Sequence, residues 1–375
     1  MISNRIILYN YSIKLGFMNA RERYLAVFED KARTKLDRVS THVQYTREEF
    51  INKYKDEILE NYSETLFYNY YFDIPLALGF DSVFAPFPSS YKTKLVKIRQ
   101  NNGKYIRIKE DGQAIRRKTP FYEGGYIHSI DILDDIHANI KKIDNSELLK
   151  KTLRKYEQLA PKIFPVLTVD GIFDKVWKSM GMVTFSRNFR KNTHLYKKLI
   201  KFYAKLAKLN IEGLIDATGE RGKVVTLLDD VAFKGRSMIS KERWNQDFLP
   251  YYKEINSIII DSNMIPQIHT DGDPTELIPS FQEAGFQGLQ GWEGGANPQF
   301  INEKYPNFVV IGFGDVSHIL PYGDQSQVIA HVKSLMDIFK ENKHFILGPS
   351  TVIFKEIPLK NVITFINAAR KYGKY

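Results

Sequence analysis

Polar and charged side chains follow each of the late apolar runs of this sequence. They are Asp229, Asp230, Lys234 and Arg236 after residues 224–228, His269 and Asp271 after 265–268, Gln290 and Glu293 after 286–289, Asp315 after 308–311, and Ser350 and Thr351 after 345–347. Carboxylates and imidazoles are the groups that transfer protons or bind divalent metal ions. Four successive runs are followed by a carboxylate, which predicts that these groups share one site.

The segment His269-Thr270-Asp271 carries the sharpest spacing signal. Residues two apart in an extended chain point to the same side. His269 and Asp271 are therefore predicted catalytic residues that share a proton or bind a divalent metal ion, with Glu293 as a third ligand or a base. The alternative is that Asp271 only accepts a hydrogen bond from the imidazole or caps a helix starting near Pro274.

The adjacent pair Asp229-Asp230 can direct only one side chain into a pocket, because neighbouring strand residues point in opposite directions. We expect Asp230 to face the pocket, since Asp229 continues the alternation of Val225 and Leu227. The other predicted substrate contacts are Lys234, Arg236, Gln290, Asp315 and Ser350. Lys234 and Arg236 suit an anionic substrate equally as well as they suit a solvated loop.

These residues need a framework that places strand ends together. From residue 163 onward short apolar runs alternate with helix-like stretches, which predicts parallel strands joined by right-handed crossovers. The predicted strands are 163–167, 213–215, 224–228, 265–268, 286–289, 308–311 and 345–347. Seven or eight such units favour a closed (β/α)8 TIM barrel, an α/β fold whose active sites lie at the carboxyl ends of the strands.

The N-terminal part of the chain has a different pattern. Residues 1–75 are predicted to be a mostly helical segment packing on the barrel, and residues 76–375 to form the barrel, within a single structural domain. Alternating residues around Asn101-Asn102-Gly103 predict a β-hairpin excursion near 94–108. The aromatic run from Tyr68 to Phe72 is interpreted as helix packing. Residues 1–20 have no assigned role.

Composition excludes several classes of protein. The 375 residues contain no cysteine, which excludes disulfides, thiolate nucleophiles and Cys-ligated metal sites. No apolar stretch reaches the roughly 20 residues of a membrane helix, and no signal peptide is recognised, so a cytoplasmic protein is expected. The net charge is +11, but Lys and Arg are spread along the chain without an arginine-rich run, which argues against nucleic acid as a partner.

From about Arg21 to the C-terminus the chain resembles the uroporphyrinogen decarboxylase superfamily, which includes corrinoid-linked methyltransferases. The resemblance covers some nine-tenths of the chain and rests on these segments: Arg21-Glu22-Arg23, Asp37-Arg38-Val39, 77–81, 228–240, 269–273, 277–279, 283–286, Gly348-Pro349-Ser350 and 358–361. It implies a (β/α)8 barrel.

Two departures from the family pattern bear on the reaction. The Met-Arg-Gln-Ala-Gly-Arg segment of the decarboxylases is missing after Arg38, where the chain reads Val39-Ser40-Thr41-His42-Val43-Gln44. The methyltransferase branch binds zinc through His-x-Cys and a distant Cys. His269 aligns with that histidine, Asp271 with the first cysteine, and Thr351 or Ser350 with the second. Oxygen ligands make a harder site, suited to polarising an oxygen.

The resemblance therefore implies a methyltransferase-like enzyme. It would move a methyl group between a small oxygen-linked donor and a corrinoid carried by a partner protein, with zinc or another divalent metal as a candidate cofactor. The alternative is a cofactor-free decarboxylase, a lyase acting on a porphyrinogen or other poly-acid. A third hypothesis is a catalytically silent barrel that binds a corrinoid protein or a small ligand. A homodimer is left open.

Overall fold

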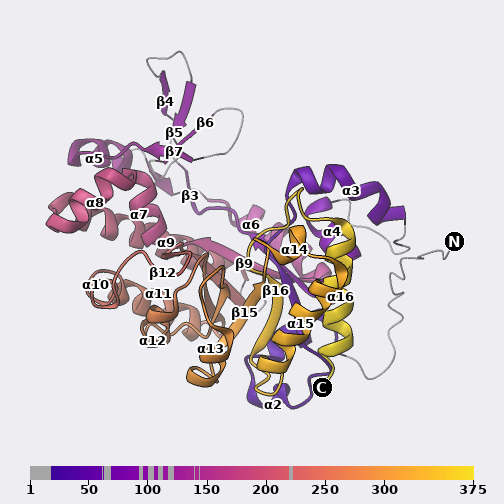
Figure 1. The fold of residues 1–375 in the computed structure, drawn as a ribbon. Coiled ribbons are helices and arrows are strands. Elements are labelled where there is room, and N and C mark those ends of the chain that lie inside the picture. Colours follow the sequence, from indigo (N-terminus) through magenta and orange to yellow (C-terminus); the bar gives the residue numbers. More distant parts are fainter. Residues whose placement is uncertain are drawn as a thin grey trace.

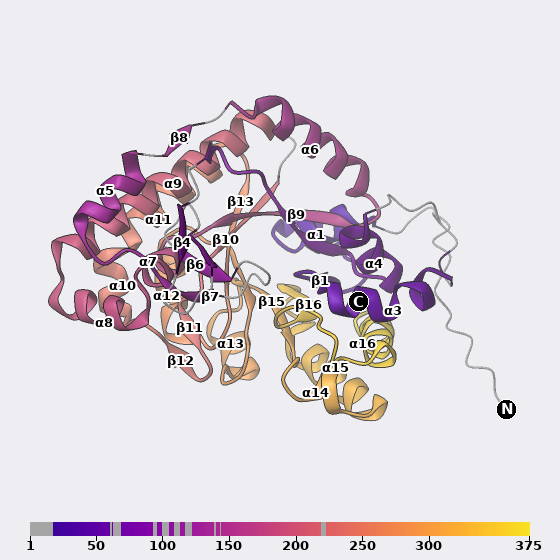
Figure 2. The ribbon, with the colours of Figure 1, turned by 90° about the horizontal axis from the view of Figure 1, so that it is seen from above.

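Eight parallel strands close into a barrel in the computed structural model, which describes residues 18–60, 62, 69–92, 96–99, 105–108, 113–116, 122–138, 140–142, 144–218 and 223–375. Around the barrel the strands are β1 (Ser40–Val43), β16 (Phe345–Pro349), β15 (Val309–Gly314), β14 (Gly288–Gly291), β13 (Ile265–Thr270), β10 (Val224–Leu228), β9 (Phe164–Asp170) and β2 (Ser82–Pro86). The predicted α/β (β/α)8 barrel is confirmed (Figures 1 and 2).

Helices follow every barrel strand. In chain order they are α3 (Glu48–Glu60) and α4 (Tyr70–Leu78) after β1; α5 (Ile130–Ala138) and α6 (Ser146–Leu159) after β2; α7 (Phe173–Met180), α8 (Met182–Lys191) and α9 (His194–Thr218) after β9; α10 (Lys241–Asp247) and α11 (Leu249–Asp261) after β10; η1 (Thr275–Leu277) and α12 (Ile278–Glu283) after β13; α13 (Pro298–Lys304) after β14; α14 (Ile319–Tyr322) and α15 (Gln325–Phe339) after β15; and α16 (Leu359–Tyr372) after β16. This alternation brings all eight strand ends to one rim.

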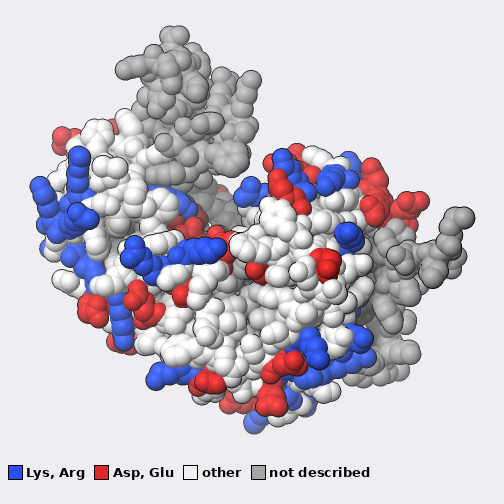
Figure 3. Space-filling model, viewed as in Figure 1, with Lys and Arg blue, Asp and Glu red and all other residues white. Residues whose placement is uncertain are grey.

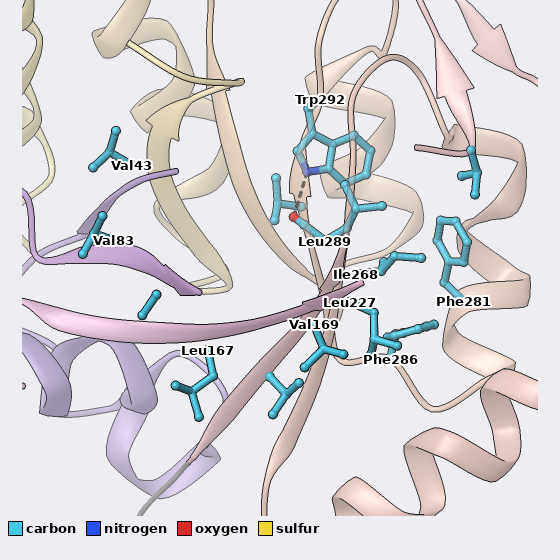
Figure 4. Packing of buried hydrophobic residues seen from close by; sticks show 14 of the residues in the cluster. Val43, Val83, Leu167, Val169, Leu227, Ile268, Phe281, Phe286, Leu289 and Trp292 are labelled. Carbon is cyan, nitrogen blue, oxygen red and sulfur yellow. Dashed lines mark hydrogen bonds between the residues drawn. The ribbon is translucent and has the colours of Figure 1, made fainter. Parts of the chain in front are cut away.

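Apolar side chains of the late strands point outward into the helical layer. Leu227, Ile268 and Leu289 are fully buried there, and Figure 4 shows Leu227 and Ile268 close to Phe286. Burial of one such aliphatic side chain stabilises the fold by about 1.5–3 kcal/mol. Because strand residues alternate, the residues that follow each of these three point into the barrel.

Two short helices, α1 (Ala20–Ala26) and α2 (Asp30–Arg33), precede the barrel. A buried ion-pair network fixes them to it. Asp81, just before β2, accepts hydrogen bonds from Arg38 at 2.7 Å and from Arg23 of α1 at 2.8 Å. Arg23 also binds Asp37 at 2.7 Å. The first barrel strand, β1, thus lies within residues 1–75.

An antiparallel sheet projects from the barrel between β2 and α5 (Figure 1). It contains β4 (Val96–Arg99), β5 (Tyr105–Ile108), β6 (Gln113–Arg116) and β7 (Tyr122–Gly125). A separate pair joins β3 (Tyr91–Lys92) to β8 (Lys141–Lys142). The expected hairpin corresponds to β4 and β5, which pair from Val96 opposite Ile108. Its predicted turn at 101–103 lies outside the described residues, as do Tyr68 and residues 1–17.

One predicted strand is wrong. Residues 213–215 belong to the last turns of α9, a helix of 25 residues. The apolar run Gly-Leu-Ile is short, and it continues the helical spacing of buried positions that includes Ile211 and Leu214. Within the described part of the chain, no helix has the length and apolar character needed to cross a bilayer.

Candidate functional site

Asp230, His269 and Asp271 form one cluster at the carboxyl ends of β10 and β13. His269 Nε2 lies 3.7 Å from Asp230 Oδ1 and 3.8 Å from Asp271 Oδ1. One candidate ligand atom from each residue lies within 4.8 Å of the other two. The barrel therefore brings an imidazole and two carboxylates from two neighbouring strand ends into a single group.

The orientation of His269 is fixed by its neighbour on β14. His269 pairs with Gln290 in the parallel register, and its Nδ1 donates a hydrogen bond to the Gln290 carbonyl oxygen at 3.1 Å. The neutral imidazole then carries its proton on Nδ1, so the Nε2 lone pair faces the two carboxylates. This is the arrangement that orients metal-binding histidines.

Gln290 is itself held from both sides. It is fully buried, its Oε1 accepts a hydrogen bond from Gln44 Nε2 at 3.1 Å, and its Nε2 donates to the Ser350 carbonyl oxygen at 3.4 Å. Gln44 follows β1 and Ser350 follows β16. The residue whose backbone carbonyl orients His269 is thus tied, through its own side chain, to the loops that follow β1 and β16.

Asp229 and Asp230 point in different directions. Asp229 is buried, and its carboxylate accepts hydrogen bonds from the backbone N–H groups of Phe173 at 3.3 Å and Asp174 at 2.6 Å, and from the Tyr252 hydroxyl. Burial raises the pKa of Asp229 to about 6, although these donors oppose the shift. Asp229 therefore satisfies the first turn of α7, whereas Asp230 faces His269.

Lys178 on α7 belongs to the cluster and was not found from the sequence. Its Nζ lies 2.6 Å from Asp174 Oδ1 and 3.3 Å from Asp230 Oδ2. Burial favours the neutral form of Asp230, but His269 and Lys178 outweigh it and hold the pKa of Asp230 below its usual value. The sequence signal for Lys178 is only its i,i+4 spacing from Asp174.

Burial dominates the electrostatics of Asp271. It raises the pKa of Asp271 to about 6, with the charges of Asp230 and Glu293 adding to the shift and His269 opposing it. Asp271 Oδ1 has no hydrogen-bond partner among the described residues. Glu293 lies outside the group of three, and its Oε1 accepts a hydrogen bond from Ser317 Oγ at 3.1 Å. Asp230, and not Glu293, is the third member of this group of three.

The remaining sequence candidates lie around the rim. Lys234 and Arg236 are exposed on the hairpin of β11 (Ala232–Phe233) and β12 (Arg236–Ser237), and the Arg236 guanidinium lies 5.1 Å from the centre of the Phe233 ring. Asp315 Oδ1 accepts backbone hydrogen bonds from residues 317 and 318, at 2.7 and 2.8 Å. Thr351 is partly exposed beside the buried Ser350.

A second imidazole lies inside the barrel beneath the cluster. His42 on β1 is fully buried, and its Nδ1 lies 2.9 Å from Ser82 Oγ. The Phe84 ring lies between the two imidazoles, with centroids 4.7 Å from His42 and 6.0 Å from His269. Burial, assisted by the charge of His269, lowers the pKa of His42 to about 3. The sequence analysis did not single out His42, which stands in the stretch from Val39 to Gln44.

The cluster is chemically suited to a divalent cation. His269 presents a free Nε2, Asp230 presents Oδ1, and Asp271 presents an oxygen without a hydrogen-bond partner. One nitrogen and two or more carboxylate oxygens form a harder donor set than thiolates, and three protein ligands leave a coordination position for a substrate. The residues present therefore fit a metal ion.

The fold and the charged cluster define a (β/α)8 barrel with its polar site at the rim where such barrels carry out catalysis. The family model described as uroporphyrinogen decarboxylase (URO-D) matches residues 172–372, more than half of the chain, and the protein belongs to this family. The sequence resemblance to the superfamily is confirmed. Members of the superfamily are methyltransferases or decarboxylases.

The solved structures similar to this chain match it at low sequence identity. A methyltransferase from Methanosarcina mazei superposes with a TM-score of 0.62 at 15% identity, covering 95% of this chain and 99% of that one. A sugar phosphate isomerase/epimerase from Parabacteroides distasonis matches with a TM-score of 0.33 at 11% identity, covering 90% and 96% of the two chains. No curated protein sequence matches this chain.

Proposed function

We propose that this protein is a methyltransferase that moves a methyl group from a small oxygen-linked donor to a corrinoid carried by a separate protein. The observation that carries the proposal is the group of Asp230, His269 and Asp271 at the strand ends, with His269 held by Gln290. Family membership and the methyltransferase among the similar folds support the same reaction class.

In this reaction the bond between the methyl carbon and the donor oxygen breaks, a carbon–cobalt bond forms, and the oxygen takes up a proton. A divalent metal ion held by Asp230, His269 and Asp271 would supply Lewis-acid polarisation of that oxygen. Gln290 orients His269, and Lys178 holds the second oxygen of Asp230. Without a metal ion, His269 Nε2 in its protonated form is placed to donate the proton to the leaving oxygen.

The charge of the cluster favours this reaction over decarboxylation of a poly-acid. The charges of Asp230 and Glu293 act on Asp271, and the nearby cation Lys178 is already paired with Asp174 and Asp230. A substrate bearing several carboxylates would be repelled here. The lysines and arginines that give the whole chain its net charge of +11 lie mostly outside this cluster.

The test combines metal analysis with methyl transfer. Purified protein and its Asp271→Asn variant are analysed for bound divalent metal, and both are mixed with methyl ethers or methoxy compounds and cob(I)alamin, with formation of methylcobalamin followed by absorbance. We expect one metal ion per chain and methyl transfer in the wild type, and loss of both in the variant. Release of carbon dioxide from a porphyrinogen would instead select the lyase, and corrinoid-protein binding without turnover would select the silent barrel.

A further inference from the structure

One stretch of the chain has a strong local excess of positive charge. Residues 175–211 contain ten Lys and Arg and no Asp or Glu, in a chain whose net charge is +11. Arg190-Lys191 and Lys197-Lys198 are adjacent pairs, and the other neighbouring cations are separated by two to eight residues, so no long basic run stands out in the sequence. This stretch, which lies in α7, α8 and most of α9, therefore carries a local net charge of +10.

Folding divides these cations between the inside and the outside. Lys178 points to the candidate site, and Lys175 pairs with Asp170 at 2.8 Å. On α9, by contrast, Lys197, Lys201 and Lys205 are exposed. Their spacing of four residues places them on one face of the helix, about 6 Å apart along its axis.

The preceding helix adds to this surface. Arg187, Arg190 and Lys191 of α8 are exposed, α8 packs against α9, and Figure 3 shows blue side chains over the edge where α8 lies in Figure 1. None of these three residues, nor the exposed lysines of α9, forms an ion pair with another described residue. We call these six cations on α8 and α9 the basic hairpin.

Two exposed apolar side chains lie in the chain between Lys178 of the candidate site and the basic hairpin. Met182 and Val183, at the start of α8, are 44% and 67% exposed, and they follow Lys178 of the cluster by only four and five residues. Exposed apolar side chains next to a charged border are typical of protein interfaces. A protein seated on the basic hairpin would therefore lie beside α7, the helix from which Lys178 reaches Asp230.

The side chains around the basic hairpin argue against nucleic acid and against an anionic membrane as its binding partner. The aromatic side chains Phe185, Tyr196 and Phe202 are buried, and the partly buried Phe189 ring is covered by the Arg243 guanidinium, so these four rings offer no open platform on which bases could stack. Two exposed apolar residues are too few for the apolar face that an interfacial membrane helix buries. Complementary charge on a folded protein satisfies the same cations without either feature.

We infer that the basic hairpin docks an acidic protein surface; under the proposed function, on which this assignment of the partner rests, that surface belongs to the protein that carries the methyl acceptor. Docking beside α8 would bring the acceptor to the rim of the barrel. The charge on α8 and α9 then steers the encounter, and its contribution weakens as salt is added.

The test measures binding apart from catalysis. Fluorescein-labelled poly-L-glutamate, duplex DNA of equal charge and phosphatidylserine vesicles are titrated with the full chain at 50 and 200 mM NaCl. The hairpin variant is Lys197→Glu/Lys201→Glu/Lys205→Glu, and the matched control, with the same change of charge on exposed residues elsewhere, is Lys355→Glu/Lys360→Glu/Lys371→Glu. Circular dichroism verifies that both variants fold.

We expect poly-L-glutamate binding that falls at least tenfold in the hairpin variant and less than threefold in the control. Equal losses in both variants, or tighter hairpin-dependent binding of DNA or vesicles, would overturn the inference. Methyl transfer to free cob(I)alamin should be unchanged in the hairpin variant. If no variant transfers methyl groups but hairpin-dependent binding persists, the proposed function fails and the docking surface stands.

Discussion

His269 on β13 and Gln290 on β14 are register partners, and the Nδ1–H of the first donates to the backbone carbonyl of the second at 3.1 Å. A backbone acceptor cannot be removed by substitution and moves only if the strand moves. The tautomer of His269 is therefore set by the barrel itself, and its Nε2 is directed at Asp230 and Asp271.

Replacing His269 tests the centre of the cluster. We expect His269→Ala to lower methyl transfer by at least about 100-fold, because a positioned imidazole contributes roughly 10²–10⁴-fold as an acid or base. Metal content measured on the same preparation separates a ligand from a proton donor: loss of metal together with activity indicates a ligand. Unchanged transfer from every accepted donor would contradict both roles.

Substitutions of the neighbours Asp229 and Asp230 should have different effects on stability and on metal affinity. Asp229→Asn weakens the acceptor for the first turn of α7, and we expect a loss of about 0.5–2 kcal/mol in the free energy of unfolding with metal affinity largely retained. Asp230→Asn should lower metal affinity by at least about 10-fold with a smaller loss of stability. Urea denaturation and metal titration distinguish the two; identical profiles for both variants would refute the division of roles.

His42 should make stability depend on pH. Its pKa is lowered to about 3 in the folded protein, whereas an unfolded histidine titrates near 6.5. Between these pH values the unfolded chain binds a proton at His42 that the folded chain excludes. The contribution of the neutral His42 to stability is therefore complete above about pH 6.5 and is lost as the pH falls.

We therefore expect the free energy of unfolding of the wild type to fall, relative to that of His42→Leu, by up to about 1.4 kcal/mol for each pH unit below 6.5. Urea denaturation at pH 7, 6 and 5 measures it. His128→Gln, a substitution at an exposed histidine, is the control and should follow the wild-type curve. Parallel curves for wild type and His42→Leu would show that the buried imidazole is not responsible.

Gly291, at the end of β14, allows the strands beside the cluster to approach closely. Its φ is +137°, and a Cβ there would lie 2.0 Å from the Thr270 carbonyl oxygen. We expect Gly291→Ala to destabilise the protein by more than about 3 kcal/mol, since backbone atoms must move. Gly235→Ala, at φ +86° with no neighbour within 4 Å, should cost only about 1 kcal/mol. Thermal unfolding compares them, and equal effects would be contrary to this view.

The fold could be predicted from the sequence because its signals are local. Alternating apolar runs and helix-like stretches indicated the barrel, and strand-end positions indicated His269, Asp271 and Asp230. The run at 213–215 failed because three apolar residues fit a strand and a helix equally well. Its place in α9 is decided by the helical packing on both sides of it.

What the sequence by itself determined is the architecture, the family and the residue types available at the rim. Only the tertiary structure decided which of them meet. Lys178 reaches Asp230 from helix α7, His42 on the first strand contacts the same Phe84 ring as His269, and Asp229 turns away to hold α7. Such contacts join residues tens to hundreds of positions apart, and distances of this kind are set by barrel closure and strand register, which leave no local pattern in the chain.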